Sequence, residues 1–139
     1  MATTIRAEIS QKNRYYIDKH RHYELKHFCL QYPKWKKACA DCLDGDVPVS
    51  MIDGVRESEG VYDPTSTRAI TRAHYSRRIQ MLEKVAKDSD RYLWRYILKA
   101  VTEGLSYTYL KTKLDIPCGK DMYYDRYRRF FWLLSELRD

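Results

Sequence analysis

The sequence has no long hydrophobic run, and it is poor in glycine and proline. Five Gly and four Pro among 139 residues are too few for a fibrous or low-complexity chain. The longest apolar run, residues 130–134, is far shorter than the roughly 20 residues of a membrane-spanning helix, and residues 1–10 lack the apolar segment of a signal peptide. We therefore expect a compact soluble domain that stays in the cytoplasm.

Cysteine is also scarce, with four residues unevenly spaced at Cys29, Cys39, Cys42 and Cys118. A chain of this length buries enough apolar surface to fold without disulfides. Cys39 and Cys42 form a CxxC pair downstream of several histidines, which leaves a zinc site as an alternative. The pair lies in a helical pattern with no second pair and no adjacent glycine. We therefore predict reduced, buried thiols and no metal or cofactor.

Catalytic motifs are missing as well. The sequence contains no glycine-rich phosphate-binding loop, no HExxH and no GxSxG. The prediction is that the protein is not an enzyme.

Positive charge and tyrosine, by contrast, are abundant. Twenty-six Lys and Arg against nineteen Asp and Glu give a net charge of +7, and thirteen residues are Tyr. A basic protein favours an acidic partner, nucleic acid first, although a ribosome or a membrane surface would attract a similar charge. Tyrosine beside arginine suits a polyanion-binding surface, and it equally fills the core of a small helical domain.

Charge divides the chain into three segments. Residues 1–43 carry nine basic and four acidic side chains, residues 44–66 one and six, and residues 67–139 sixteen and nine. The middle stretch also holds Gly or Pro at five positions, which is typical of a loop. We predict an N-terminal helical segment at 1–43, an acidic linker at 44–66, and a C-terminal DNA-binding domain at 67–139.

Hydrophobic spacing of three and four residues predicts helices outside the linker, and no segment indicates a strand. The first helix covers residues 12–31, and the second runs from Pro33 to Leu43. One face of the first helix is marked by Tyr16, His20, Tyr23, His27 and Leu30.

Two further helices follow the linker. A long basic helix begins near Asp63–Thr65 and ends near residues 88–90. The next contains Leu93, Ile97, Ala100 and Val101 on one face. Gly104 closes it, because glycine readily takes the left-handed conformation after a helix.

Residues 97–137 predict a helix-turn-helix. Ser106 is placed to cap a short helix that ends near Leu114, because its hydroxyl can accept a backbone N–H of the first turn. Pro117 prevents the helix from continuing, and a basic helix begins near Lys120. In this arrangement the last helix enters the major groove of DNA.

The last helix has an apolar and a polar side at 100° per residue. The predicted core face consists of Met122, Tyr123, Tyr127, Phe130, Leu133, Leu134 and Leu137. Arginine on the opposite side can bridge guanine O6 and N7 or bind phosphate. The predicted DNA-binding residues are Ser106, Tyr107, Lys111, Lys120, Asp121, Tyr124, Asp125, Arg128 and Arg129.

The segment EGLSYTYLKTKLDIP resembles the opening of region four in bacterial sigma factors. The longer pattern from DPTSTRAITRAH through YILKAVTEGLSYTYLKTKLDIPCGKDMYYDRYRRFFWLL resembles the RinA and ArpU group of phage transcriptional activators. The resemblance implies a phage or prophage regulator that binds promoter DNA and activates late packaging and lysis genes in a bacterial host cell.

Carried over by position, the resemblance implies a scaffold of Gly104, Leu110, Leu114 and Ile116, and a reading helix with Lys120, Tyr124, Arg128 and Arg129. The chain departs from the general pattern at two places. Lys111 stands where a small Ala is usual between the helices, and Asp115 stands where Gly usually makes the turn. These departures leave the angle of the reading helix open.

Together these features predict an all-α helical bundle with a sigma region four-like C-terminal helix-turn-helix. The expected partner is double-stranded DNA, bound by a monomer or a homodimer, and contact with RNA polymerase is left open. The alternative is a phage DNA-packaging or other helical interaction protein, such as a small terminase component. Assembly discriminates between them, because a ring of many subunits favours packaging.

Overall fold

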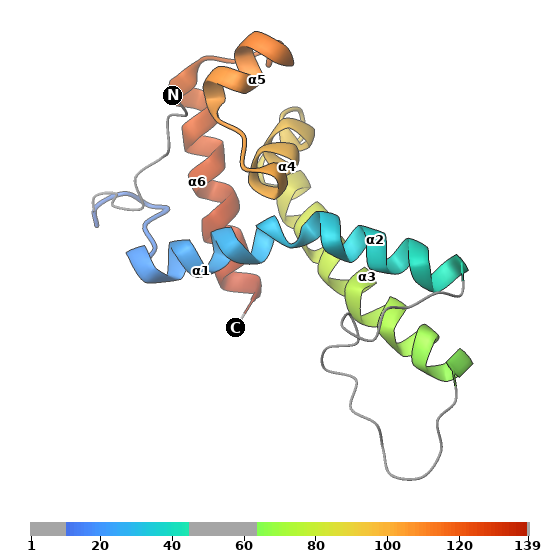
Figure 1. The fold of residues 1–139 in the computed structure, drawn as a ribbon. Coiled ribbons are helices and arrows are strands. Elements are labelled where there is room, and N and C mark those ends of the chain that lie inside the picture. Colours follow the sequence, from blue (N-terminus) through green and yellow to red (C-terminus); the bar gives the residue numbers. More distant parts are fainter. Residues whose placement is uncertain (1–10, 45–63, 139) are drawn as a thin grey trace. The chain divides into compact units, whose positions relative to one another are not determined.

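The structure is a computed structural model that describes residues 11–44 and 64–138, and all regular structure in these ranges is α-helical (Figure 1). The helices are α1 (Lys19–Leu30), α2 (Tyr32–Asp44), α3 (Pro64–Ser89), α4 (Trp94–Glu103), α5 (Tyr107–Lys113) and α6 (Lys120–Leu137). None of the helices in the described ranges is long and apolar enough to cross a membrane. The predicted all-α class is therefore confirmed for this part of the chain.

The chain forms two compact units whose boundaries differ from the predicted segments. The larger unit comprises Met1–Gln31 and Leu82–Asp139, and the smaller comprises Tyr32–Met81. α1 therefore belongs with the C-terminal helices rather than with α2. Most of the predicted linker lies outside the described residues, and its last three residues, 64–66, are already part of α3.

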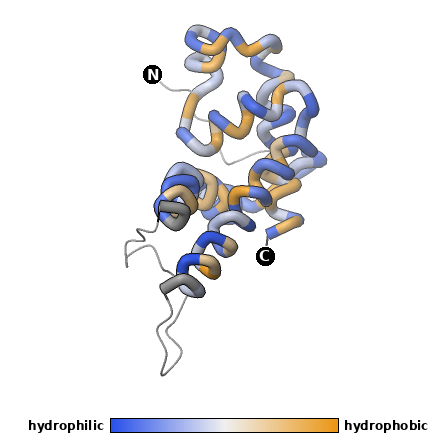
Figure 2. The backbone as a smooth tube through the Cα atoms, turned by 90° about the vertical axis from the view of Figure 1, so that its right-hand side faces the viewer, coloured by the Kyte–Doolittle hydropathy of each residue, from blue (hydrophilic) through white to orange (hydrophobic). Residues whose placement is uncertain are grey.

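The larger unit has its core between α1, α4, α5 and α6. α1 packs against α4 and α6, and α4 packs against α5 and α6. Hydrophobic and hydrophilic residues alternate along the helices, as expected where each buries one face (Figure 2). The side chains with almost no exposed surface include Leu25, Leu82, Ile97, Leu110, Ile116, Tyr123, Phe130, Phe131 and Leu134.

α1 is attached to the C-terminal end of α6 by two arginines. Arg21 donates hydrogen bonds to the hydroxyl and the carbonyl of Ser135, each at 3.2 Å. The Arg138 guanidinium lies 4.1 Å from the centre of the Phe28 ring and pairs with Glu24 at 3.2 Å. These contacts join segments more than 100 residues apart, which explains why α1 is part of the larger unit.

The predicted start of the first helix at residue 12 is wrong. α1 begins at Lys19, because the Asp18 carboxylate accepts the N–H of His20 at 3.0 Å and caps the helix. The face marked by Tyr23 and Leu30 is also the exposed one, with 42% and 38% of these side chains accessible. The buried residues of α1 are His22, Leu25, Phe28 and Cys29.

The smaller unit consists of α2 and the first part of α3. Trp35 and Tyr75 are buried, and the Arg78 guanidinium lies 5.5 Å from the centre of the Trp35 ring. The Cys39 thiol lies 3.8 Å from the Arg72 carbonyl and is only half-buried, so the prediction of a fully buried thiol is wrong at this position. The side chain of Cys42 lies outside the described residues.

Candidate nucleic-acid interface

The junction between α4 and α5 follows the sequence signals closely. Gly104 has a φ of 70°, and the N–H of Leu105 returns to the carbonyl of Ala100 at 3.0 Å. The Ser106 hydroxyl accepts the N–H of Tyr109 at 3.2 Å, which confirms it as the N-cap of α5. A Cβ at Gly104 would meet Leu30 at an ordinary 3.6 Å, so the need for glycine comes from the backbone conformation.

The turn between α5 and α6 contains a left-handed residue. Asp115 has a φ of 51° and is the one residue other than glycine with positive φ in the described ranges. The N–H groups of Leu114 and Ile116 both reach the Leu110 carbonyl, at 3.2 and 3.1 Å, which closes the turn. Aspartate tolerates this conformation better than most residues, so it can stand where the resemblance implies glycine.

Two of the predicted DNA-binding residues also make hydrogen bonds within this turn. The Tyr107 hydroxyl donates to the carbonyl of Cys118 at 2.8 Å. The exposed Lys111 ammonium lies 3.4 Å from the carbonyl of Ile116. Both side chains therefore connect α5 to the residues just before α6.

A cluster of aromatic rings fixes α6 against the rest of the unit. Tyr123 lies 5.5 Å from Tyr107 and 5.1 Å from Tyr124, measured between ring centres. Tyr127 lies 4.9 Å from Phe131, which in turn is 4.8 Å from His22 of α1. Burial raises the pKa of the Tyr123 and Tyr127 hydroxyls well above the usual value, so both stay neutral.

The predicted core face of α6 is confirmed at Tyr123, Phe130 and Leu134, which are buried, but it is wrong at four other positions. Tyr124, assigned to the DNA-facing side, is only 9% exposed, and Phe131, left out of the core, is 1% exposed. Met122 and Leu137, assigned to the core, are each 48% exposed. The buried face is rotated by about 60° from the predicted one at 100° per residue.

A partly buried ion pair joins α6 to the loop before α4. The Asp90 carboxylate accepts the N–H groups of Tyr92 and Leu93 at 2.8 Å and binds Arg126 Nε at 2.9 Å. Burial tends to raise the pKa of Asp90, but these three donors outweigh it and hold the pKa below its usual value. Arg126 also binds Asp125 at 2.7 Å. Sequence reasoning missed this pair, because 36 residues separate Asp90 from Arg126 and no local pattern links them.

The remaining predicted residues lie along the first three turns of α6. Lys120 and Asp121 are exposed together with Met122, whereas Asp125, Arg128 and Arg129 are half-buried. Within residues 11–44 and 64–138, Arg128 and Arg129 form no ion pair, and their Nε atoms are buried without a hydrogen-bond partner. Their positive charge is therefore not cancelled by a neighbouring carboxylate in this part of the chain.

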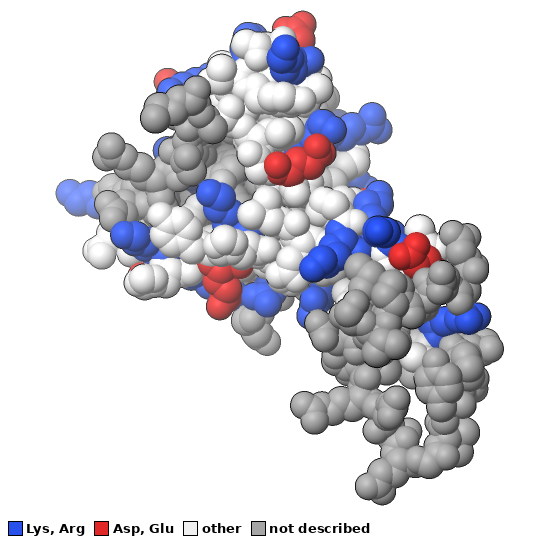
Figure 3. All heavy atoms as spheres, viewed as in Figure 1, with Lys and Arg blue, Asp and Glu red and all other residues white. Residues whose placement is uncertain are grey.

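The surface around these helices is basic. Residues 11–31 and 82–138 carry seventeen Lys and Arg against ten Asp and Glu. Basic side chains also predominate over acidic ones on the face drawn in Figure 3. Among the described residues, no three His, Cys, Asp or Glu side chains come together as a metal site would require.

No protein family, no curated protein and no solved structure compared with the chain matches it.

Proposed function

We propose that the protein binds double-stranded DNA sequence-specifically through α5 and α6, acting as a helix-turn-helix regulator of transcription. The supporting observation is the arrangement of these two helices. α5 is short and capped, the turn is closed by Tyr107 and the Leu110 carbonyl, and the first turn of α6 is exposed. A reading helix needs such an exposed N-terminal turn to reach base edges in the major groove.

The side chains at the start of α6 have suitable chemistry. Lys120 places its ammonium 5.9 Å from the centre of the Tyr124 ring, so this buried tyrosine orients a phosphate-binding group instead of contacting DNA itself. Asp121 can accept a hydrogen bond from cytosine N4. Arg129, half-buried and without an ion pair among the described residues, is the best candidate for a bidentate contact to guanine.

The resemblance to the RinA and ArpU group extends the proposal to a biological role. On that basis the targets are promoters of phage or prophage late genes, and RNA polymerase is a second partner. The basic surface of the larger unit supports the DNA-binding part of this role, since phosphate contacts supply most of the affinity for duplex DNA.

Selection from a library of random duplexes of about 30 base pairs tests the proposal. We expect a defined sequence to be enriched, and its affinity to fall linearly with salt on logarithmic axes, at about 0.9 per phosphate neutralised. Arg129→Ala should weaken binding to that sequence about tenfold and relax the preference at one base pair.

Arg129→Lys is the matched control, because it keeps the charge but loses the two-pronged hydrogen bond. It should preserve the salt dependence while losing the base preference. Enrichment of no sequence, or equal base preference in wild type and Arg129→Ala, would refute reading by this residue. A ring of many subunits in sedimentation would favour the DNA-packaging role instead.

A further inference from the structure

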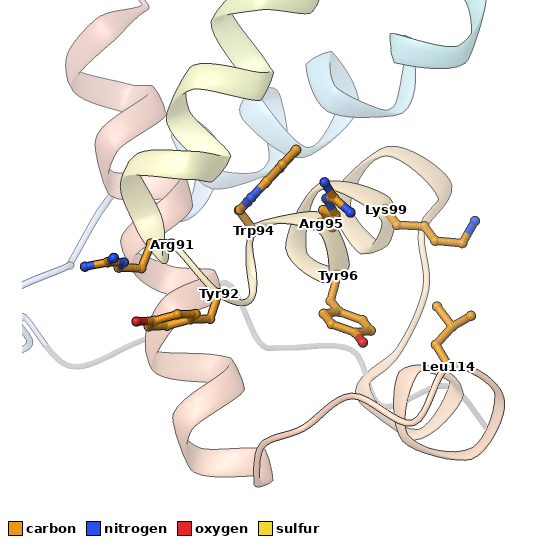
Figure 4. Close-up of a pocket in the computed structure, with 7 residues that line it drawn as sticks. All are labelled: Arg91, Tyr92, Trp94, Arg95, Tyr96, Lys99 and Leu114. Carbon is orange, nitrogen blue, oxygen red and sulfur yellow. The ribbon is translucent and has the colours of Figure 1, made fainter.

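A second basic surface lies in the larger unit, around the beginning of α4. The loop before α4 and the first turns of that helix form an open hollow of about 670 Å³, which Leu114 closes on one side (Figure 4). The cations that line it are Arg91, Arg95 and Lys99, and none of the described residues in its lining is acidic. Three aromatic residues, Tyr92, Trp94 and Tyr96, also line it, so it combines positive charge with flat apolar surface.

Tyr92 is the most exposed large hydrophobic side chain in the described residues, at 76%. The Arg91 guanidinium lies 5.1 Å from the centre of its ring. The backbone beneath the ring is held in place, because the N–H of Tyr92 binds the Asp90 carboxylate at 2.8 Å. Tyr92 therefore offers an exposed aromatic ring on an anchored stretch of backbone while contributing little to the core.

Trp94 adds a second ring with cations close to it. Lys87 lies 5.0 Å and Arg95 5.3 Å from the centre of the Trp94 ring. Lys99 pairs with Glu103 at 3.1 Å, whereas Lys87, Arg91 and Arg95 form no ion pair with any residue that the structure describes. The nearby acid Asp88 is exposed and pairs with Lys84 at 3.6 Å.

We propose that this hollow binds single-stranded nucleic acid, with an unpaired base stacked on Tyr92 and the adjacent phosphates on Arg91, Arg95 and Lys87. Proteins bind unpaired strands by this combination of cations along a groove and aromatic rings for the bases. In a duplex the bases are stacked on one another, so only their edges and the backbone are accessible. An exposed tyrosine ring then finds no base face on which to stack. An acidic peptide would use the cations but would leave the ring without a planar partner.

The inference extends the proposed DNA binding by adding an unpaired strand beside the duplex, yet it is tested separately. The probe is a fluorescently labelled oligothymidylate of twelve nucleotides, and binding is followed by fluorescence anisotropy. We expect Tyr92→Ala to weaken this binding about tenfold, as the loss of one base stack. Tyr92→Phe, which keeps the ring, should bind nearly as well as the wild type. Tyr23→Ala, which removes a 42% exposed tyrosine of α1, should have no effect.

An abasic oligonucleotide of the same length and charge separates stacking from charge. The inference is supported if the abasic strand binds several-fold more weakly than oligothymidylate. Equal binding of the abasic strand, full competition by an oligoglutamate of twelve residues, or unchanged affinity in Tyr92→Ala would each overturn it. Binding of Tyr92→Ala to the selected duplex reports on α6 alone, so failure here leaves the duplex proposal standing.

Discussion

The orientation of α6 can be tested by truncating one residue on each of its two disputed sides. Phe131 is buried, with ring centres 5.2 Å from Phe130, 4.9 Å from Tyr127 and 4.8 Å from His22. Met122 lies two and a half turns earlier and is 48% exposed. The hydrophobic pattern of the sequence assigns the opposite roles, with Met122 in the core and Phe131 outside it.

The two truncations should differ strongly in their effect on stability. Phe131→Ala removes a fully buried ring and leaves a cavity between α1 and α6, which costs about 3–5 kcal/mol of unfolding free energy. Met122→Ala removes atoms that are half in contact with water, so we expect a change within about 0.5 kcal/mol. The difference is large compared with the total stability of a domain, about 5–15 kcal/mol.

Urea unfolding followed by circular dichroism measures both changes. With a slope of about 1–3 kcal/mol per molar urea, the midpoint of Phe131→Ala should fall by at least 1 M, and that of Met122→Ala should barely move. A larger loss for Met122→Ala than for Phe131→Ala would show that the helix is oriented as the sequence pattern suggests. Equal, small losses would place neither residue in the core.

Two further predictions concern the turn and the buried histidine. Asp115→Gly should raise the unfolding free energy by about 0.5–1 kcal/mol, and Gly104→Ala should lower it by about 1 kcal/mol. The reason is that only glycine adopts these left-handed conformations without strain. Thermal melts in which both substitutions change stability in the same direction would contradict this. Burial and the charge of Lys26 lower the pKa of His22 to about 4, from 6.5 in an unfolded chain. Between these pH values His22 takes up a proton in the unfolded chain but not in the folded protein. The unfolding free energy should therefore be highest above pH 6.5 and fall by about 3 kcal/mol as the pH drops to 4. In thermal melts from pH 7 to 4, the stability of His22→Leu should depend less on pH than that of the wild type. The control His27→Leu, on the exposed side of α1, should keep the wild-type pH dependence. Identical pH curves for His22→Leu and the wild type would rule out this role of His22.

The ends of most helices were determined by local sequence. Gly104 ends α4 and Ser106 begins α5 because each acts through its own backbone or the next turn, within reach of three or four residues. The break after α5 and the start of α6 near Lys120 follow from Pro117 in the same way. Such signals need no distant partner, so they can be recognised without the fold.

Which side of a helix is buried was decided by tertiary structure. α6 carries six aromatic residues besides its Leu side chains, and tyrosine suits a core or a wet surface equally well, so the sequence allows more than one buried face. Contacts with His22 of α1 and Tyr107 of α5 select the face that contains Tyr124 and Phe131. The same holds for Asp90 and Arg126, whose pairing depends on the way α4 packs against α6. These choices rest on residues far apart in the chain, and only the folded arrangement brings them together.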